Sequence, residues 1–254
     1  PATCVTNVIV SGLPAGWSAP INGIGCNNGS DVDFNIATGV WTVSSTNCYY
    51  GPNNTADSEA FAQRTLCGDG SITALVTGIN PLANGWAGVV MRESTAPGAT
   101  KAQLVTNLSN LSRREFRTTT NGAASLQQFP SLNRYWLRIV RAGNQFTMYV
   151  SPNGTTWYPA GTQIIVMQSC IQVGLVLTNY TSNSTVTGTF SNVGFTQVNP
   201  VFVGPAPIQP TLGQVEFDVF PNPTSGELNL DLTQYIGRSV RIETYSLEGK
   251  LLQF

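Results

Sequence analysis

Carboxylates are the side chains with which this chain could most readily do chemistry. The first 199 residues contain these acids: Asp31, Asp33, Asp57, Glu59, Asp69, Glu93 and Glu115. A retaining glycosidase holds its acid and its nucleophile about 5–5.5 Å apart, and a Glu-x-Asp-x-x-Glu phrase achieves this by strand alternation. That phrase does not occur, and the two pairs at strand spacing, Asp31/Asp33 and Asp57/Glu59, fall in sequence typical of loops. We therefore predict that the chain is not an enzyme.

Histidine is absent from the chain, which excludes a Ser–His–Asp triad and leaves cysteine nucleophiles without a base. The cysteines are Cys4, Cys26, Cys48, Cys67 and Cys170. They show no C-x-x-C spacing, so disulfides are favoured over a zinc site. Cys26 and Cys48 flank one loop-rich segment and are the first pair that we expect. Disulfides favour an extracellular location.

Residues 27–33 read Asn-Asn-Gly-Ser-Asp-Val-Asp and could supply oxygen ligands to calcium. Calcium takes 6–8 oxygens in flexible geometry, and Asp31 and Asp33 would lead the set, with Asp57 and Glu59 as further ligands. The alternative is an ordinary turn with side-chain-to-backbone hydrogen bonds, and the composition favours this alternative. We expect no other cofactor.

Aromatic side chains are the best remaining sign of a ligand, because sugar faces stack on aromatic rings. Six residues at predicted loop edges or on a predicted polar strand form the candidate binding set: Tyr49, Tyr50, Trp86, Arg117, Trp157 and Tyr158. Trp41 and Trp136 fall inside predicted strands, where core packing is the expected role.

Charge is sparse and balanced, with 12 basic and 13 acidic residues and a net charge of -1. Nucleic acid or an anionic membrane surface would need a basic field, so neither is an expected partner. Arg113, Arg114 and Arg117 are predicted to form a solvated or glycan-facing strand. No apolar run reaches about 18 residues, so no membrane insertion is expected. The chain enters a strand pattern at once, as a cleaved secreted protein would.

Turn signals recur about every 8–12 residues between β-branched and aromatic segments, which is typical of a β-sandwich. The predicted strands are 4–10, 39–44, 71–77, 87–92, 102–107, 114–119, 135–141, 145–151, 171–178 and 187–198. A Gly143-Asn144 corner and a Pro152-Asn153-Gly154 turn predict a three-stranded meander. The proline-rich segment 200–214 predicts a semi-stiff linker between domains 1–199 and 215–254.

Several phrases in one fixed order give the first domain a family resemblance. They include Cys67-Gly68-Asp69-Gly70, Trp86-Ala87-Gly88-Val89, Gly143-Asn144, Ser151-Pro152-Asn153-Gly154 and Phe190-Ser191-Asn192-Val193. Together they resemble the concanavalin A-like lectin/glucanase superfamily, in particular the non-catalytic modules of bacterial secreted glycosidases and surface proteins. The resemblance implies an all-β, antiparallel two-sheet jelly-roll sandwich with polysaccharide as its usual partner.

Two phrases near the C-terminus give a second resemblance. One contains Pro221, Asn222, Pro223 and Gly226, and the other runs from Tyr245 through Gly249 and Lys250. In this order they resemble the C-terminal sorting domain of Bacteroidetes type IX secretion substrates. The resemblance implies a small β-sandwich-like domain, the type IX machinery as partner, and export through the periplasm to the cell surface or medium. That family closes with a Gly-x-Tyr strand, which is missing before Phe254, so this domain is expected to be truncated.

The leading hypothesis is a secreted, non-catalytic polysaccharide-binding module at the cell surface or in the matrix. The rival is a structural subunit of an extracellular assembly, which would bring self-association. A minor alternative is the accessory subunit of a glycosidase.

Overall fold

The structure, a computed structural model of the whole chain, describes residues 12–20, 22–26, 29–46, 48, 55–82, 85–179 and 184–198, and the backbone of four two-residue strands further on. The chain divides into two compact units, Pro1–Pro200 and Val201–Phe254. The predicted strand 4–10 and the predicted linker 200–214 lie outside the described residues.

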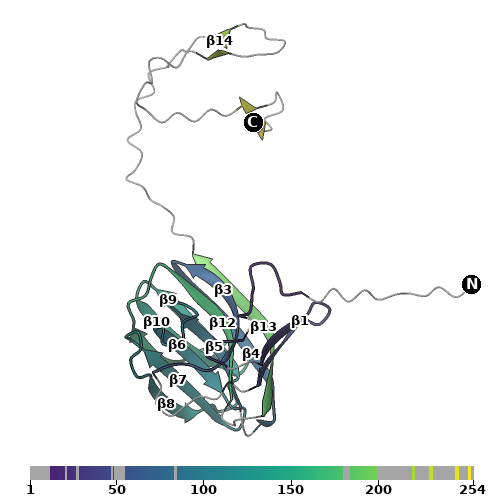
Figure 1. The fold of residues 1–254 in the computed structure, drawn as a ribbon, viewed down its shortest axis with the longest axis vertical. Coiled ribbons are helices and arrows are strands. Elements are labelled where there is room, and N and C mark those ends of the chain that lie inside the picture. The colour runs from purple at the N-terminus through teal and green to yellow at the C-terminus, as the bar shows by residue number, and fades with distance from the viewer. Residues whose placement is uncertain are drawn as a thin grey trace, which may run out of the picture. The chain divides into compact units, whose positions relative to one another are not determined.

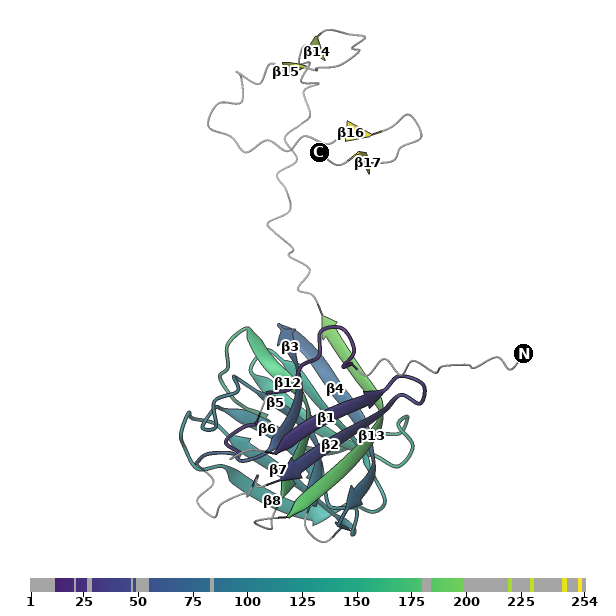
Figure 2. The ribbon, with the colours of Figure 1, turned by 45° about the vertical axis from the view of Figure 1, so that its right-hand side comes forward.

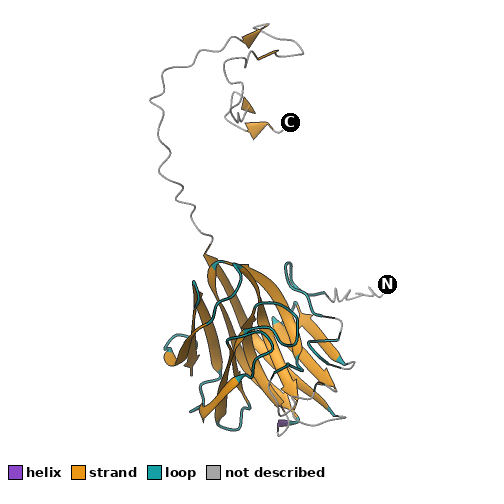
Figure 3. Ribbon diagram, turned by 60° about the vertical axis from the view of Figure 1, so that its left-hand side comes forward, coloured by secondary structure: helices purple, strands orange, loops and turns teal. Residues whose placement is uncertain are grey.

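The named elements of the first unit are all strands (Figure 3). They are β1 Ser30–Asn35, β2 Val40–Thr46, β3 Ala60–Cys67, β4 Asp69–Asn80, β5 Gly85–Arg92, β6 Lys101–Thr106, β7 Leu111–Arg117, β8 Ser125–Pro130, β9 Trp136–Ala142, β10 Gln145–Ser151, β11 Tyr158–Ile164, β12 Cys170–Asn179 and β13 Thr185–Val198.

Two antiparallel sheets pack face to face (Figure 1). The seven-stranded sheet has the order β1-β2-β13-β4-β9-β10-β11, and the six-stranded sheet has the order β3-β12-β5-β6-β7-β8. The late strands β13 and β12 are inserted between early ones, and Figure 2 shows β13 beside β2. The first unit is therefore the all-β jelly-roll sandwich that the sequence predicts.

Strand alternation explains how these sequences form the core. In β2, Trp41, Val43 and Ser45 are buried, whereas the residues between them are only half-buried. The same two-residue period sends Ile72, Ala74 and Val76 of β4 inward. The inward rows of both sheets meet in one apolar core.

The predicted meander is confirmed as β9, β10 and β11, which are adjacent in the sheet. Gly143 has a φ of 59° in the β9–β10 turn, a conformation that glycine adopts cheaply. The backbone N–H of Gly143 also donates to Asp69 Oδ1 at 2.6 Å. This bond ties the turn to the start of β4.

Three strands were missed by the sequence prediction, β1, β3 and β8, whereas β11 was expected only as the third strand of the meander. β1 and β8 lie at sheet edges. β8 is almost wholly exposed and carries no apolar alternation, whereas β1 alternates exposed Asp31 and Asp33 with half-buried Val32 and Phe34 over only six residues. Placing Asp31 and Asp33 in a loop was therefore wrong, because both lie in β1. Polar edge strands discourage pairing with other chains. The same polarity makes them hard to predict from sequence.

Two disulfides are present among the described residues. Cys26 bonds to Cys48, as predicted, and Cys67 bonds to Cys170. The second bond joins opposed residues of β3 and β12. Cys4 lies outside the described residues.

In the second unit, β14 (Val219–Phe220) pairs with β15 (Asn229–Leu230), and β16 (Thr244–Tyr245) pairs with β17 (Leu251–Leu252). The two pairs bracket the two phrases that gave the sorting resemblance. Of the sorting residues, only the backbone of Tyr245 is described, and Pro221, Asn222, Pro223, Gly226, Gly249 and Lys250 lie outside the described residues.

Candidate functional site

Two neighbouring strands bring an aromatic pair to one end of the sandwich. Phe34 of β1 stands opposite Trp41 of β2 in the antiparallel register. Both rings point to the inner side of the sheet, with their centroids 4.9 Å apart. Trp41 is almost fully buried in the core, as the sequence predicts, whereas Phe34 is half-buried at the edge.

A third ring arrives from the segment that precedes β1. Ser18 bridges Gln63 of β3 through two backbone hydrogen bonds of 2.8 Å, which fixes this segment along the edge of the six-stranded sheet. The turn before it closes with the N–H of Trp17 donating to Pro14 O at 3.0 Å. Trp17 is thereby held against Trp41, with ring centroids 4.7 Å apart.

An arginine completes this end of the molecule. The guanidinium of Arg64, on β3, lies 3.7 Å from the ring centroid of Phe195 on β13 and 5.7 Å from that of Trp17. No carboxylate and no hydrogen-bond acceptor contacts this guanidinium among the described residues, and its Nε atom is buried without a partner. Cation–π attraction is the interaction that holds it.

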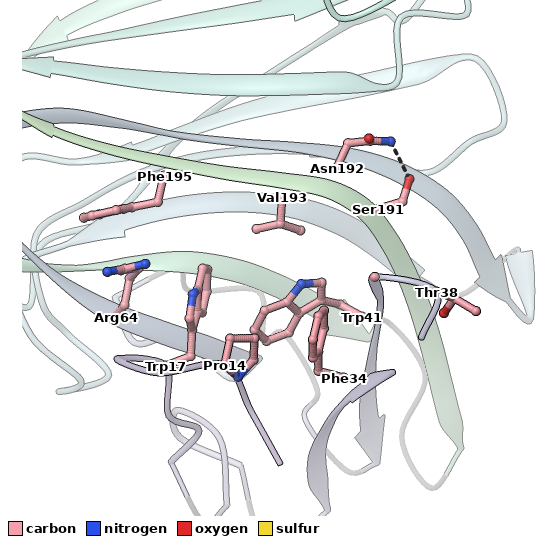
Figure 4. A pocket seen from close by; sticks show the side chains of 11 residues that line it. Pro14, Trp17, Phe34, Thr38, Trp41, Arg64, Ser191, Asn192, Val193 and Phe195 are labelled. Carbon is pink, nitrogen blue, oxygen red and sulfur yellow. Dashed lines mark hydrogen bonds between the residues drawn. The ribbon is translucent and has the colours of Figure 1, made fainter. Parts of the chain in front are cut away.

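These side chains enclose a cavity of about 490 Å³, which we call the aromatic pocket (Figure 4). It is lined by Pro14, Trp17, Phe34, Thr38, Gly39, Trp41, Arg64, Ser191, Asn192, Val193 and Phe195. Arg64 and Phe195 lie at one end, Thr38 lies at the other, and the rings of Trp17, Trp41 and Phe34 lie between.

A β-bulge builds the upper wall of the pocket. The pairing of β13 with β4 shifts register between Ser191 and Gly194, and Asn192 has a φ of 51°. A bulge re-aims the side chains around it, and here Val193 and Phe195 face the pocket. The Nδ2 of Asn192 donates to Ser191 Oγ at 3.1 Å, which leaves polar atoms at the rim beside the apolar floor.

The four members of the predicted binding set that the structure describes, Trp86, Arg117, Trp157 and Tyr158, are not brought together. Trp86 is half-buried on the outer face of the six-stranded sheet, with the Arg113 guanidinium 4.6 Å from its ring centroid. Trp157 and Tyr158 stand at β11, where they stack with Arg138 at 3.9 Å and Arg134 at 3.7 Å. Desolvation lowers the pKa of Arg138, although Tyr149 opposes the shift. Tyr49 and Tyr50 lie outside the described residues.

The expectation that Arg113 and Arg117 lie on a solvated or glycan-facing strand is wrong, because both are buried. They belong to a set of buried ionic side chains on the outer face of the six-stranded sheet, which we call the charged cluster: Asp57, Glu59, Arg92, Lys101, Arg113, Glu115 and Arg117. Arg117 donates from both terminal nitrogens to the two carboxylate oxygens of Asp57, at 2.8 Å and 2.7 Å. A buried guanidinium needs such a bidentate partner. The charged row of β7 lies on the outer face of the sheet, opposite the inward-facing Phe116, and meets these acids there.

Lys101 joins the acids of the charged cluster. Its Nζ lies 2.9 Å from Asp57 Oδ1 and 3.1 Å from Glu115 Oε2, and it donates to Gln103 Oε1 at 2.8 Å. Arg92 adds contacts of 2.6 Å to Glu59 and 3.2 Å to Asp57. The pair Asp57/Glu59, predicted as a loop and as further calcium ligands, is instead matched by cations.

The two acids of this pair titrate in opposite directions. Burial alone would raise the pKa of Asp57, but Lys101, Arg117 and Arg92 together outweigh it and lower the pKa to about 2. Burial raises the pKa of Glu59, and the neighbouring carboxylates of Asp57 and Glu115 add to the rise against Lys101 and Arg92. Asp57 is therefore the carboxylate of the charged cluster that the surrounding cations hold in its ionised form.

The predicted calcium ligands Asp31 and Asp33 are exposed on one side of β1. Asp31 Oδ1 accepts a hydrogen bond from the backbone N–H of Val32 at 2.9 Å. Within the described ranges no group of three metal-ligating side chains is present. The strand, rather than a ligand loop, explains the spacing of these acids.

Sequence reasoning missed Trp17, Phe34, Arg64 and Phe195 as lining residues. They come from four separate segments. The register of β1 on β2, the bridge of Ser18 to Gln63 and the pairing of β13 with β2 and β4 bring them together. The available local signal was Pro14-Ala15-Gly16 before Trp17, a turn that presents an aromatic ring.

Comparison with known proteins supports the fold. No protein family matches the chain. No curated protein matches it in sequence either. Among solved structures, a functionally unknown protein from Saccharomyces cerevisiae aligns with a TM-score of 0.55 at 16% identity, covering 72% of this chain and 97% of that chain. A GH43 protein from Bacillus licheniformis, BlXynB, aligns with a TM-score of 0.51 at 14% identity, covering 75% of this chain and 38% of that chain.

The carbohydrate-binding module CBM66 from Bacillus subtilis aligns with a TM-score of 0.37 at 19% identity, covering 71% of this chain and 94% of that chain. At these identities the likenesses concern the fold alone. The alignments with the yeast protein and with BlXynB agree with the fold of the first unit. Among the described residues there is no helix long and apolar enough to cross a membrane.

Proposed function

We propose that this chain is a secreted, non-catalytic polysaccharide-binding protein whose aromatic pocket holds the glycan. The observation that carries the proposal is a cavity in which the rings of Trp17 and Phe34, backed by the buried Trp41, lie beside polar atoms of Ser191 and Asn192. Rings stack on the apolar face of a pyranose, and rim groups can bind its hydroxyls. The volume of the aromatic pocket, about 490 Å³, falls in the usual range of ligand pockets, roughly 300–1,000 Å³.

The non-catalytic part of the proposal is supported by the state of the carboxylates. Asp57, Glu59 and Glu115 are buried and lie against Lys101 or an arginine. A glycosidase needs two carboxylates that reach one sugar bond from opposite or adjoining positions. The aromatic pocket has no acidic residue in its lining.

The test uses the full chain in affinity gels that contain xylan, β-glucan, alginate or polygalacturonate. We expect retardation by at least one polymer, and we expect Trp17→Ala to weaken this binding roughly tenfold, since one stacking ring is lost. Trp157→Ala should keep the binding. If Trp157→Ala loses binding and Trp17→Ala keeps it, the pocket is not the site. Near-ultraviolet circular dichroism checks that each variant is folded.

The same protein should release no reducing sugar from these polymers. Turnover that vanishes in Glu59→Gln or Glu115→Gln would make the chain a glycosidase and overturn the non-catalytic assignment.

Export by the type IX route is proposed from the C-terminal phrases, and the strand pairs that bracket them support it. Two disulfides in the first unit agree with an oxidising destination. Fusion of the native C-terminal region to an unrelated periplasmic protein should carry that protein to the surface. Surface delivery of a variant that lacks residues 215–254 would show that the segment is not the signal.

A further inference from the structure

Cationic side chains of the first unit have two kinds of partner, carboxylates and aromatic rings. In the charged cluster, Arg92 contacts Glu59 at 2.6 Å and Arg117 contacts Asp57 at 2.7 Å. Arg64 contacts no carboxylate among the described residues and stacks between the rings of Phe195 and Trp17. It is the single charged side chain in the lining of the aromatic pocket.

The stacked geometry holds the guanidinium ready for an anion. Phe195 lies 3.7 Å from the guanidinium carbon and fixes the plane of the group. The Nε atom is buried without an acceptor, a cost that folding bears to hold this orientation. A planar guanidinium held in this way binds a carboxylate through two parallel hydrogen bonds, with little further loss of side-chain entropy.

The rest of the pocket specifies what carries the anion. Apolar rings of Trp17, Trp41 and Phe34 extend from Arg64 toward Thr38, so a ligand must present an apolar face next to its charge (Figure 4). A small inorganic anion would leave those rings uncovered. A sugar ring with a carboxylate at one end meets both requirements.

We propose that the aromatic pocket selects uronate residues of acidic polysaccharides, with Arg64 as the residue that determines specificity. This inference rests on the proposed glycan-binding function and names its substrate class. The charge of the ligand takes the place of the acid partner that Arg64 lacks among the described residues.

The test compares polygalacturonate with the same polymer after its carboxyl groups have been reduced to alcohols. The full chain should bind polygalacturonate roughly tenfold more tightly, as expected for charge-assisted hydrogen bonds. Added salt should narrow this difference, because the contact is ionic. Arg64→Gln should bind both polymers as the wild type binds the reduced one, and Arg64→Lys should keep only part of the preference, because it retains the charge without the planar fork.

Arg134→Gln is the matched control, because Arg134 also stacks on a ring, that of Tyr158, but away from the pocket lining. It should keep the full preference for the uronate. Equal binding of both polymers by the wild type, with Trp17→Ala still weakening it, would overturn the uronate assignment and leave the proposed function standing. A stronger preference for a sulfated glucan than for polygalacturonate would also overturn it. Binding to no polymer at all would overturn both.

Discussion

The aromatic pocket and the charged cluster contain similar residues but differ in how their cations are paired. Both combine cations with aromatic rings, since Arg113 stacks on Trp86 in the cluster as Arg64 stacks on Phe195 in the pocket. In the cluster, acids of the same chain surround Lys101 and the arginines. In the pocket, the described lining residues include no acid.

This difference separates structural charge from charge available to a ligand. Ionic groups that are matched inside the fold lose their affinity for outside partners and mainly determine how the sheet face packs. A cation that only rings support retains its capacity for an anion. The experiments below test whether the two regions are in fact independent, in order of decreasing expected effect.

Arg92→Met should cause the largest loss of stability, about 3–5 kcal/mol, because Glu59 would lose its contact at 2.6 Å and remain buried. Chemical denaturation measures the change. The double variant Arg92→Met with Glu59→Met should recover part of the loss, because no charge of that pair is left. If the single variant costs no more than Arg134→Ala, the charged cluster is not the tightly matched unit that its distances indicate.

Replacing both Cys26 and Cys48 by serine should have the next largest effect, roughly 3 kcal/mol, as expected for a closed loop of this size. Ile24, in the segment that Cys26 anchors, packs on the outer face of the six-stranded sheet with Phe61 and Val90. The loss should therefore fall on the cluster side. Glycan retention by the folded variant should be unchanged, and a parallel loss of retention would mean that the two regions are coupled.

The fold was largely predictable because central strands carry their two-residue alternation in local sequence, as β2 and β4 do. The meander was predictable from its two turn sequences, and the bond of Cys26 to Cys48 from the loop-rich segment that these cysteines flank. Edge strands such as β8 were not predicted, because a strand exposed to solvent needs no alternation of apolar and polar residues.

The site was less predictable than the fold, because its parts meet only through long-range pairing. Arg117 reads as a surface residue in sequence, and its burial depends on Asp57, sixty residues away. Arg64 and Phe195 are farther apart still in the chain, and nothing near either residue indicates the other. Ion pairing and stacking between distant strands therefore marked the limit of what the sequence could predict.

Asp57→Asn should show a pH-dependent loss of about 2 kcal/mol. The pKa of Asp57 falls from 3.8 to about 2 in the folded chain, so its contribution is fully present above about pH 3.8 and is lost as the pH falls through about 2. Denaturation curves between pH 7 and pH 2 should show the wild type losing its advantage over the variant in that window. Glu59→Gln is the opposing control, because the pKa of Glu59 is raised from 4.5 in the folded chain. The contribution of Glu59 to stability is therefore present below pH 4.5 and is lost as the pH rises through its pKa in the folded chain. If the wild type were still as much more stable than Asp57→Asn at pH 2 as it is at pH 7, the ion-pair explanation would be contradicted.

Gly16→Ala should produce the smallest effect and bears on the pocket alone. Gly16 has a φ of 82°, and a Cβ there would lie 3.5 Å from Arg64 Nη2, an ordinary contact. The cost should therefore come from the left-handed backbone, about 1 kcal/mol. Gly143→Ala is the matched control, since its φ of 59° carries a similar strain in a turn where a Cβ would meet nothing within 4 Å. Both variants should lose similar stability, but only Gly16→Ala should weaken binding to polygalacturonate, because the altered turn lies against Arg64 and next to Trp17. Equal binding by the two variants would show that the 12–20 segment does not position the guanidinium, and that Phe195 holds it alone.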